Sequence, residues 1–172
     1  INNSGGVTLL GPLSITGYVA ATNGNLASDG FLTLVSSATG TAYVDGAGAG
    51  NITGSVTMQR YLPSVYGYKY FSSPFQAATV GEFGDDMDLA SSFPLFYRYD
   101  EARTSSGWVS YANAANVLNP LRGYSVNFGV AGTPGTVDVS GVVNNGALSV
   151  TLFNNDNTYT KGFNLIGNPY PS

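Results

Sequence analysis

The chain has 172 residues, of which 43% are hydrophobic and only 9% are charged, and its net charge is −4. Its six Lys and Arg are scattered, so no basic stripe could neutralise nucleic-acid phosphates. The absence of His and Cys excludes disulfides, thiol enzymes, the Ser-His-Asp triad and zinc or iron–sulfur sites. No apolar run reaches the roughly 20 residues that a membrane span needs.

Gly, Asn and Ser interrupt nearly every window long enough to form a helix, so the sequence predicts an all-β protein. Helix is expected only as a turn or two, at residues 86–92 or at 108–118, and the second segment fits a loop equally well. Ser, Thr and Asn fill polar positions that charged residues occupy in most soluble domains, as in many exported β-proteins.

Residues 1–62 form a Gly-rich segment in which short apolar pairs recur between small, polar turns. The pairs that begin at Leu13, Leu32 and Ile52 are 19 and 20 residues apart. A period of about 20 is typical of stacked β-coils, each burying its apolar face on the next. An ordinary β-meander with a turn every ten residues is the alternative, and the coil stack is slightly favoured.

Residues 63–172 contain more aromatic residues and Pro, and their short alternating segments predict a β-sandwich. The expected strands cover residues 68–71, 95–99, 108–111, 124–128, 136–139, 148–152 and 163–166.

Residues 162–169 echo residues 67–74 at a constant offset of 95. Each copy reads Gly, aromatic, polar, two apolar residues, two small or polar residues, and Pro. We expect residues 163–166 to close the sheet of the first unit with Phe163 buried. We also expect residues 162–172 to start a further repeat, so that the natural protein continues beyond Ser172.

Several runs resemble one family: Gly-Ser-Val-Thr-Met-Gln-Arg-Tyr-Leu-Pro at 54–63, Tyr-Phe-Ser-Ser-Pro at 70–74, Arg-Gly-Tyr at 122–124, and Gly-Phe-Asn-Leu-Ile-Gly-Asn-Pro-Tyr-Pro-Ser at 162–172. With shorter motifs they cover most of residues 26–172. They resemble modules of large secreted and cell-surface proteins of Bacteroidota, which are similar to cargo of the type IX secretion system. The resemblance implies an extracellular or cell-surface location and a long, repetitive parent protein.

Four aromatic residues form the candidate ligand site. Tyr97 and Tyr99 alternate along one predicted strand and share a face, and Trp108 and Tyr111 follow a Gly-Trp turn where loops present side chains. Amphipathic aromatic rings of this kind stack on sugar rings in binding modules. The alternating tyrosines of residues 66–70 would likewise share one face. The competing interpretation, which we weight more heavily, places these rings in the core.

The acidic cluster is the candidate metal site. Glu82, Asp85, Asp86 and Asp88 could offer the several oxygen ligands that calcium requires, although they do not follow the EF-hand pattern. A solvated turn with an acidic helix cap is the simpler interpretation.

Catalysis is not expected. Asp100 and Glu101 are adjacent, so on a strand they point to opposite faces and cannot line one cleft as a glycosidase pair would. Together with the family resemblance, which implies a secreted or cell-surface bacterial protein, this predicts a non-catalytic structural or adhesive module. Its expected partner is a glycan or a neighbouring surface protein. The alternative is a carbohydrate-binding module attached to a secreted glycoside hydrolase.

Overall fold

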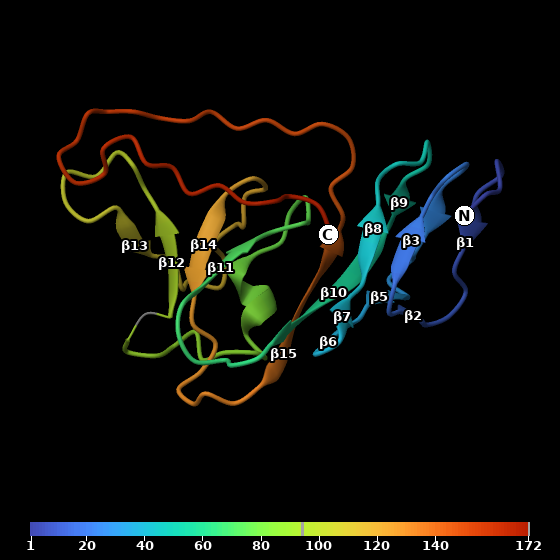
Figure 1. Ribbon diagram of the computed structural model, residues 1–172, viewed down its shortest axis with the longest axis horizontal. Helices are drawn as coiled ribbons and strands as arrows, with labels where there is room; N and C mark the ends of the chain where they lie inside the picture. The colour runs from blue at the N-terminus through green and yellow to red at the C-terminus, as the bar shows by residue number, and fades with distance from the viewer. Residues whose placement is uncertain (94, 172) are drawn as a thin grey trace.

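The computed structural model describes residues 1–93 and 95–171 and confirms an all-β protein (Figure 1). Its one helical element in these ranges is the 3-10 helix η1, Val80–Phe83, earlier in the chain than the expected turns. The strands are β1 Val7–Thr8, β2 Leu13–Ile15, β3 Tyr18–Ala20, β4 Leu26–Ala27, β5 Leu32–Leu34, β6 Ser36–Ser37, β7 Gly40–Thr41, β8 Tyr43–Asp45, β9 Ile52–Thr53, β10 Ser55–Leu62, β11 Lys69–Ser72, β12 Phe96–Tyr99, β13 Trp108–Ser110, β14 Gly123–Val126 and β15 Gly135–Val142. Among the described residues, no helix has the length and hydrophobicity that crossing a membrane requires.

Residues 1–62, the coil stack, wind into successive coils whose strands pair in parallel, apart from the short antiparallel hairpin β6-β7. One ladder is β1-β4-β9, a second is β2-β5-β10, and a third is β3-β8. Parallel neighbours separated by a full coil are incompatible with a meander, whose consecutive strands are antiparallel. The predicted equivalence of Leu32 and Ile52, 20 residues apart, is wrong. Leu32 pairs with Val56 in the β2-β5-β10 ladder, whereas Ile52 pairs with Leu26 in the β1-β4-β9 ladder.

Tight corners allow the coils to stack. A Cβ added to Gly50 would lie 2.1 Å from the carbonyl oxygen of Gly24, one coil earlier. At the same corner the side-chain oxygen of Asn25 accepts a hydrogen bond of 2.9 Å from the backbone N–H of Asn51. Gly and Asn therefore close the corners, while the apolar residues between them fill the interior.

The eight-residue strand β10 joins the coil stack to the rest of the chain. It pairs in parallel with β5 on one side and antiparallel with β15 on the other, from Ser55↔Val142 to Leu62↔Gly135. The predicted division at residue 62 is thus crossed by one continuous sheet. Only tertiary pairing could place residues 135–142 there, because their alternating pattern fits any half-buried strand.

The second sheet is antiparallel, in the order β11-β14-β12-β13. Its inner face packs toward β10 and β15, where the rings of Phe71, Phe83 and Phe128 meet at centroid distances of 5.0 to 6.3 Å. A cavity of about 330 Å³ remains between the two sheets, bordered by Met58 and Phe71 among others. The two sheets share a core, and the predicted sandwich stays a prediction.

Two predicted strands in the C-terminal region are wrong. Residues 148–152 contain no strand, and residues 163–166 contribute only a bridge between Ile166 and Arg122. Phe163 is 68% exposed, contrary to expectation. The physical reason is a turn: Lys161 and Gly162 have φ values of 49° and 77°, which an extended strand does not accommodate.

The two copies of the repeated motif nevertheless meet in space. Gly67 and Gly162 both have positive φ, at 87° and 77°. Ser72 Oγ donates a 2.5 Å hydrogen bond to the carbonyl of Asn168, beside Gly167, the equivalent of Ser72 in the second copy. The second copy therefore runs along the end of the sheet that contains the first. Ser172, its last residue, lies outside the described residues.

Candidate functional site

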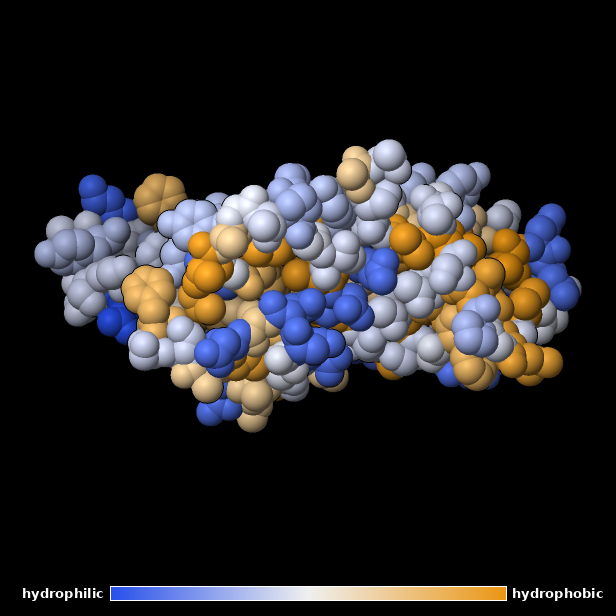
Figure 2. All heavy atoms as spheres, turned by 90° about the horizontal axis from the view of Figure 1, so that it is seen from below, coloured by the Kyte–Doolittle hydropathy of each residue, from blue (hydrophilic) through white to orange (hydrophobic). Residues whose placement is uncertain are grey.

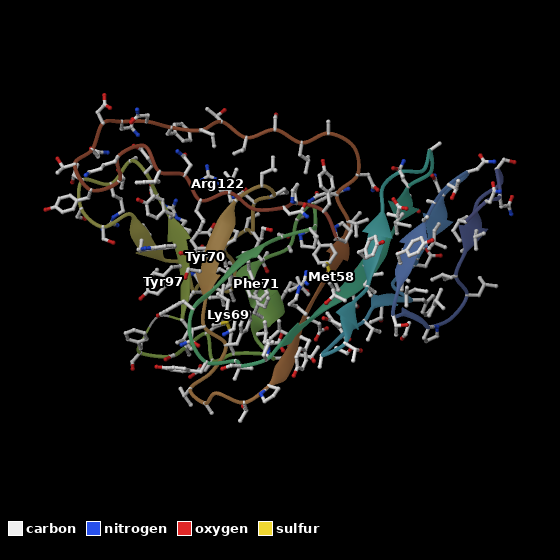
Figure 3. All side chains as sticks on the ribbon, viewed as in Figure 1. Met58, Lys69, Tyr70, Phe71, Tyr97 and Arg122 are labelled. Carbon is white, nitrogen blue, oxygen red and sulfur yellow. The ribbon has the colours of Figure 1, made fainter. Side chains whose placement is uncertain are left out.

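The outer face of the antiparallel sheet, which points away from the core, carries five aromatic side chains. Across the strands, Tyr70 lies opposite Ser125, and Ser125 lies opposite Tyr97, so these three share one face. Their neighbours Phe71 and Phe96 point to the core by strand alternation. In Figure 3, Phe71 lies toward Met58 of β10, and Tyr70 and Tyr97 lie farther from it. We call the group Tyr68, Tyr70, Tyr97, Tyr99 and Trp108 the aromatic face.

The rings of the aromatic face contact one another in two groups, in which Tyr68 and Tyr70 are exposed and the other three are half-buried. Tyr70 and Trp108 are nearly parallel, with 9° between their planes and 6.3 Å between their centroids. Tyr99 meets Trp108 edge-on at 5.2 Å, and Tyr68 meets Tyr97 at 5.8 Å. Tyr70 is 72% exposed and Tyr68 is 46% exposed. Burial and the neighbouring Tyr97 hydroxyl raise the pKa of Tyr68.

Local structure between β12 and β13 fixes this arrangement. The backbone N–H of Asp100 donates to the carbonyl of Gly107 at 2.8 Å and closes the turn between the two strands. A Cβ on Gly107 would lie 2.4 Å from the Tyr99 ring, so only glycine allows Tyr99 to pack down beside Trp108. Arg98 of β12 forms an ion pair with Asp100, the residue that follows this strand, at 3.0 Å.

Of the four predicted ligand residues, the structure brings Tyr97, Tyr99 and Trp108 together and separates Tyr111 from them. Tyr111 packs against the core, stacked on Tyr124 at 5.7 Å, and its hydroxyl donates to the Val117 carbonyl at 2.9 Å.

Sequence reasoning left Tyr68 and Tyr70 out of the candidate site. The signal was present in the alternation of residues 66–70, which predicts a shared face. Their place beside Tyr97 and Trp108 depends on β14, a strand from far along the chain that connects β11 to β12.

The acidic cluster lies along the free edge of β15. Asp86 Oδ2 accepts a 3.0 Å hydrogen bond from the backbone N–H of Asp138, and Glu82 Oε2 accepts one of 3.4 Å from that of Ser140. Asp88 accepts from Ala90 N–H in its own turn at 2.9 Å. The fourth member, Asp85, is exposed. These contacts give two of the four carboxylates a role in covering a sheet edge.

The pKa of Asp86 is raised to about 6, mainly by burial, with the nearby Asp85 and Asp138 carboxylates adding to the rise and the Asp138 N–H bond opposing it. Burial also raises the pKa of Asp138, with Asp85 adding to the shift. Within residues 1–93 and 95–171, no group of three or more acidic, His or Cys side chains is placed to hold a metal ion. The geometry thus offers no support for the candidate calcium site.

The two adjacent carboxylates have separate partners. Glu101 is buried, and its Oε1 accepts a 2.9 Å hydrogen bond from the backbone N–H of Asn155 while its Oε2 accepts from the Asn155 side chain. Its backbone carbonyl accepts from Thr160 Oγ1 at 2.7 Å. Glu101 therefore holds the C-terminal loop in place, while Asp100 pairs with Arg98.

Together these features define an all-β protein in which a parallel coil stack continues into a mixed sheet and an antiparallel sheet presents an aromatic outer face. The chain belongs to the family described as a domain of unknown function, DUF8693, whose profile matches residues 13–172. No curated protein and no solved structure matches it significantly.

Proposed function

We propose that this protein is a non-catalytic adhesive module of an exported bacterial surface protein and that it binds a neutral glycan on the aromatic face. The observation that carries the proposal is the set of contacting rings around the exposed Tyr70 and the half-buried Trp108 on the outer face of the sheet. Rings that pack only for stability are normally covered, and an exposed apolar patch commonly marks a binding surface. The apolar C–H face of a pyranose ring fits such a surface, while its hydroxyls stay in water.

The chemistry of the outer face favours an uncharged ligand. The outward positions of the four strands and of the residue before β11 are Tyr68, Tyr70, Ser72, Tyr97, Tyr99, Trp108, Ser110, Gly123 and Ser125. None of them is charged, so an anionic sugar would find no counter-charge there. Ser125 is buried between Tyr70 and Tyr97. Because its side chain is small, the surface between the two rings is recessed.

The same face would serve a carbohydrate-binding module attached to a glycoside hydrolase, and the other domains of the parent protein would distinguish the two roles. The absence of a catalytic role is supported by the lack of His and Cys and by the occupation of Glu101 and Asp100 with structural partners. Exported status is supported by the low charge and by the resemblance of the 162–172 motif to surface proteins.

Affinity gel electrophoresis on a panel of neutral and anionic polysaccharides tests the proposal. At least one neutral polysaccharide should retard the protein. Tyr70→Ala and Trp108→Ala should each weaken binding about tenfold or more, as expected for central aromatic contacts.

Tyr18→Ala is the matched control, because Tyr18 is also exposed and stacks on another tyrosine, Tyr43, at 5.7 Å in the coil stack. It should bind like the wild type. Thermal melts should show that all three variants are folded. Unchanged retention of Tyr70→Ala and Trp108→Ala, or retention by no polysaccharide in the panel, would refute the proposal.

A further inference from the structure

The cavity of about 330 Å³ between the two sheets lies on the inner side of the antiparallel sheet, opposite to the aromatic face. Met58 of β10 and Phe71 of β11 border it, and Figure 3 shows Phe71 lying toward Met58. The buried rings of Phe75, Phe83 and Phe96 also border it, so its wall is mostly apolar. Its volume is about twice the roughly 150 Å³ of a cavity that accepts benzene. It reaches the lower end of the range for small-molecule sites, so a small organic ligand has room there.

Two cationic side chains, Arg60 and Lys69, interrupt this apolar wall from opposite sheets. Arg60 shares the inner face of β10 with Met58 and Leu62, because alternate residues of a strand point to the same side. By the same alternation Lys69 shares the inner face of β11 with Phe71. Both cations are half-buried. Charged residues seldom occupy the inner face of a strand, so their presence here requires an explanation.

Positive charge is scarce in this protein. The chain has only six Lys and Arg, and two of the six border this one cavity. On the face that Figure 2 shows, strongly hydrophilic residues form only small groups among pale and hydrophobic ones. Among the described residues that line the cavity, none is Asp or Glu. The lining therefore combines an apolar wall with a positive charge.

The turn before β11 holds the Lys69 ammonium in place. Its Nζ donates to the backbone carbonyls of Tyr66 and Gly67 at 2.8 and 3.0 Å. An ammonium has three N–H donors, so these two bonds leave one for a further acceptor. The carbonyls orient the ammonium without cancelling its charge.

We propose that the cavity binds a small apolar carboxylate, with the hydrocarbon between the two sheets and the carboxylate at Arg60 and Lys69. A guanidinium can hold a carboxylate with two parallel N–H donors, and the flexible Met58 side chain adapts to an apolar tail. The exposed Asn168 and Tyr170 border the same space, so it reaches solvent beside the C-terminal segment. This site is separate from the proposed glycan site, since the two lie on opposite faces of the antiparallel sheet.

Decanoate is the probe, and the two methionines of the chain report where it binds. Met58 borders the cavity and Met87 does not. In a protein labelled with ¹³C at the methionine methyl groups, decanoate should shift the Met58 signal saturably and the Met87 signal less. Isothermal titration calorimetry on the same sample gives the affinity. Neither measurement uses a sugar, so the result does not depend on the glycan proposal.

Ligands that share the tail of decanoate test the role of charge. 1-Decanol should bind about tenfold more weakly or worse, and decyltrimethylammonium should not shift Met58. Arg60→Gln and Lys69→Gln should each weaken decanoate binding about fivefold or more and leave decanol binding unchanged. Arg103→Gln is the matched control, because Arg103 is exposed and lies outside the cavity. Thermal melts should show that the variants are folded.

Three results would each overturn the proposal. The first is a Met58 signal that does not shift at about 1 mM decanoate. The second is equal affinity for decanoate and decanol, which needs no variant to measure. The third is wild-type affinity for decanoate in a folded Arg60→Gln or Lys69→Gln protein, and either variant alone is sufficient if the other does not fold.

Discussion

The coil stack and the antiparallel sheet solve the same problem, burying short strands, by different means. In the coil stack every strand before β10 has two or three residues. Apart from the hairpin β6-β7, the strands pair with equivalent residues one coil away, as for Leu13, Leu32 and Val56. In the antiparallel sheet β14 lies between β11 and β12, which precede it in the chain by different distances. The stack therefore repeats a local pattern, whereas the sheet depends on long-range pairing.

This difference decides where each region exposes its side chains. The stack buries its apolar residues between successive coils, as for Leu26, Leu32 and Val56. The sheet buries the centre of its inner face, through Phe96, Tyr124 and Val126, and places the five rings of the aromatic face on the other side. The lesson is that a periodic unit hides its apolar residues between equivalent coils, while an antiparallel sheet leaves one face open. The proposed glycan surface arises from the second geometry.

The largest expected effect tests whether the two regions fold as one unit. Leu34→Ala in the stack and Phe96→Ala in the sheet each remove a buried side chain and should lower the free energy of unfolding by about 3–4 kcal/mol. Because the β10–β15 ladder joins the regions, both variants should unfold in a single urea transition. Leu152→Ala, at an exposed position, is the control. Two separated transitions would show that the regions are independent.

The junction itself can be disturbed with one methyl group. Gly141 on β15 faces the buried ring of Phe75, and an added Cβ would lie 2.9 Å from Phe75 Cγ. Gly141→Ala should therefore cost about 1–3 kcal/mol of stability through overpacking, measured by urea unfolding. Gly17→Ala is the control, since nothing lies within 4 Å of its added Cβ. Equal stability of the two variants would show that the junction can relax.

The smallest expected effect concerns pH at the edge of β15. The folded-state pKa of Asp86, at about 6, is above the ordinary value of 3.8, so ionisation is less favourable in the folded than in the unfolded protein. Stability from this group is therefore greatest below pH 4 and falls as the pH rises through 6.

Asp86→Asn removes that charge and keeps an oxygen that can accept from Asp138 N–H. At pH 7 to 8 the variant should be more stable than the wild type by about 1 kcal/mol, a value reduced for the partial solvent exposure of the side chain. The difference should vanish below pH 4. Thermal melts across this range measure it, with Asp88→Asn as the exposed control. A variant less stable at pH 8 than the wild type would indicate that the ionised carboxylate itself stabilises the edge.

Sequence pattern alone determined the all-β class and the position of five strands after residue 62, and it slightly favoured a coil stack over a meander for the first 62 residues. These properties follow from local alternation and from Gly and Asn at turns, which act within a few residues. The period also indicated that Leu13 and Leu32 would occupy equivalent positions, and their parallel pairing confirms it.

Tertiary structure decided which of these elements meet. It placed β15 against β10, joined Tyr70 to Trp108 and removed Tyr111 to the core side. It also turned the segment at Phe163 outward. The physical reason is that every strand has the same backbone hydrogen-bond donors and acceptors, which any other strand can satisfy. Which strands pair therefore depends on how the side chains of the whole core pack. A strand's own residues therefore show which face is apolar, and only the assembled core determines what covers it.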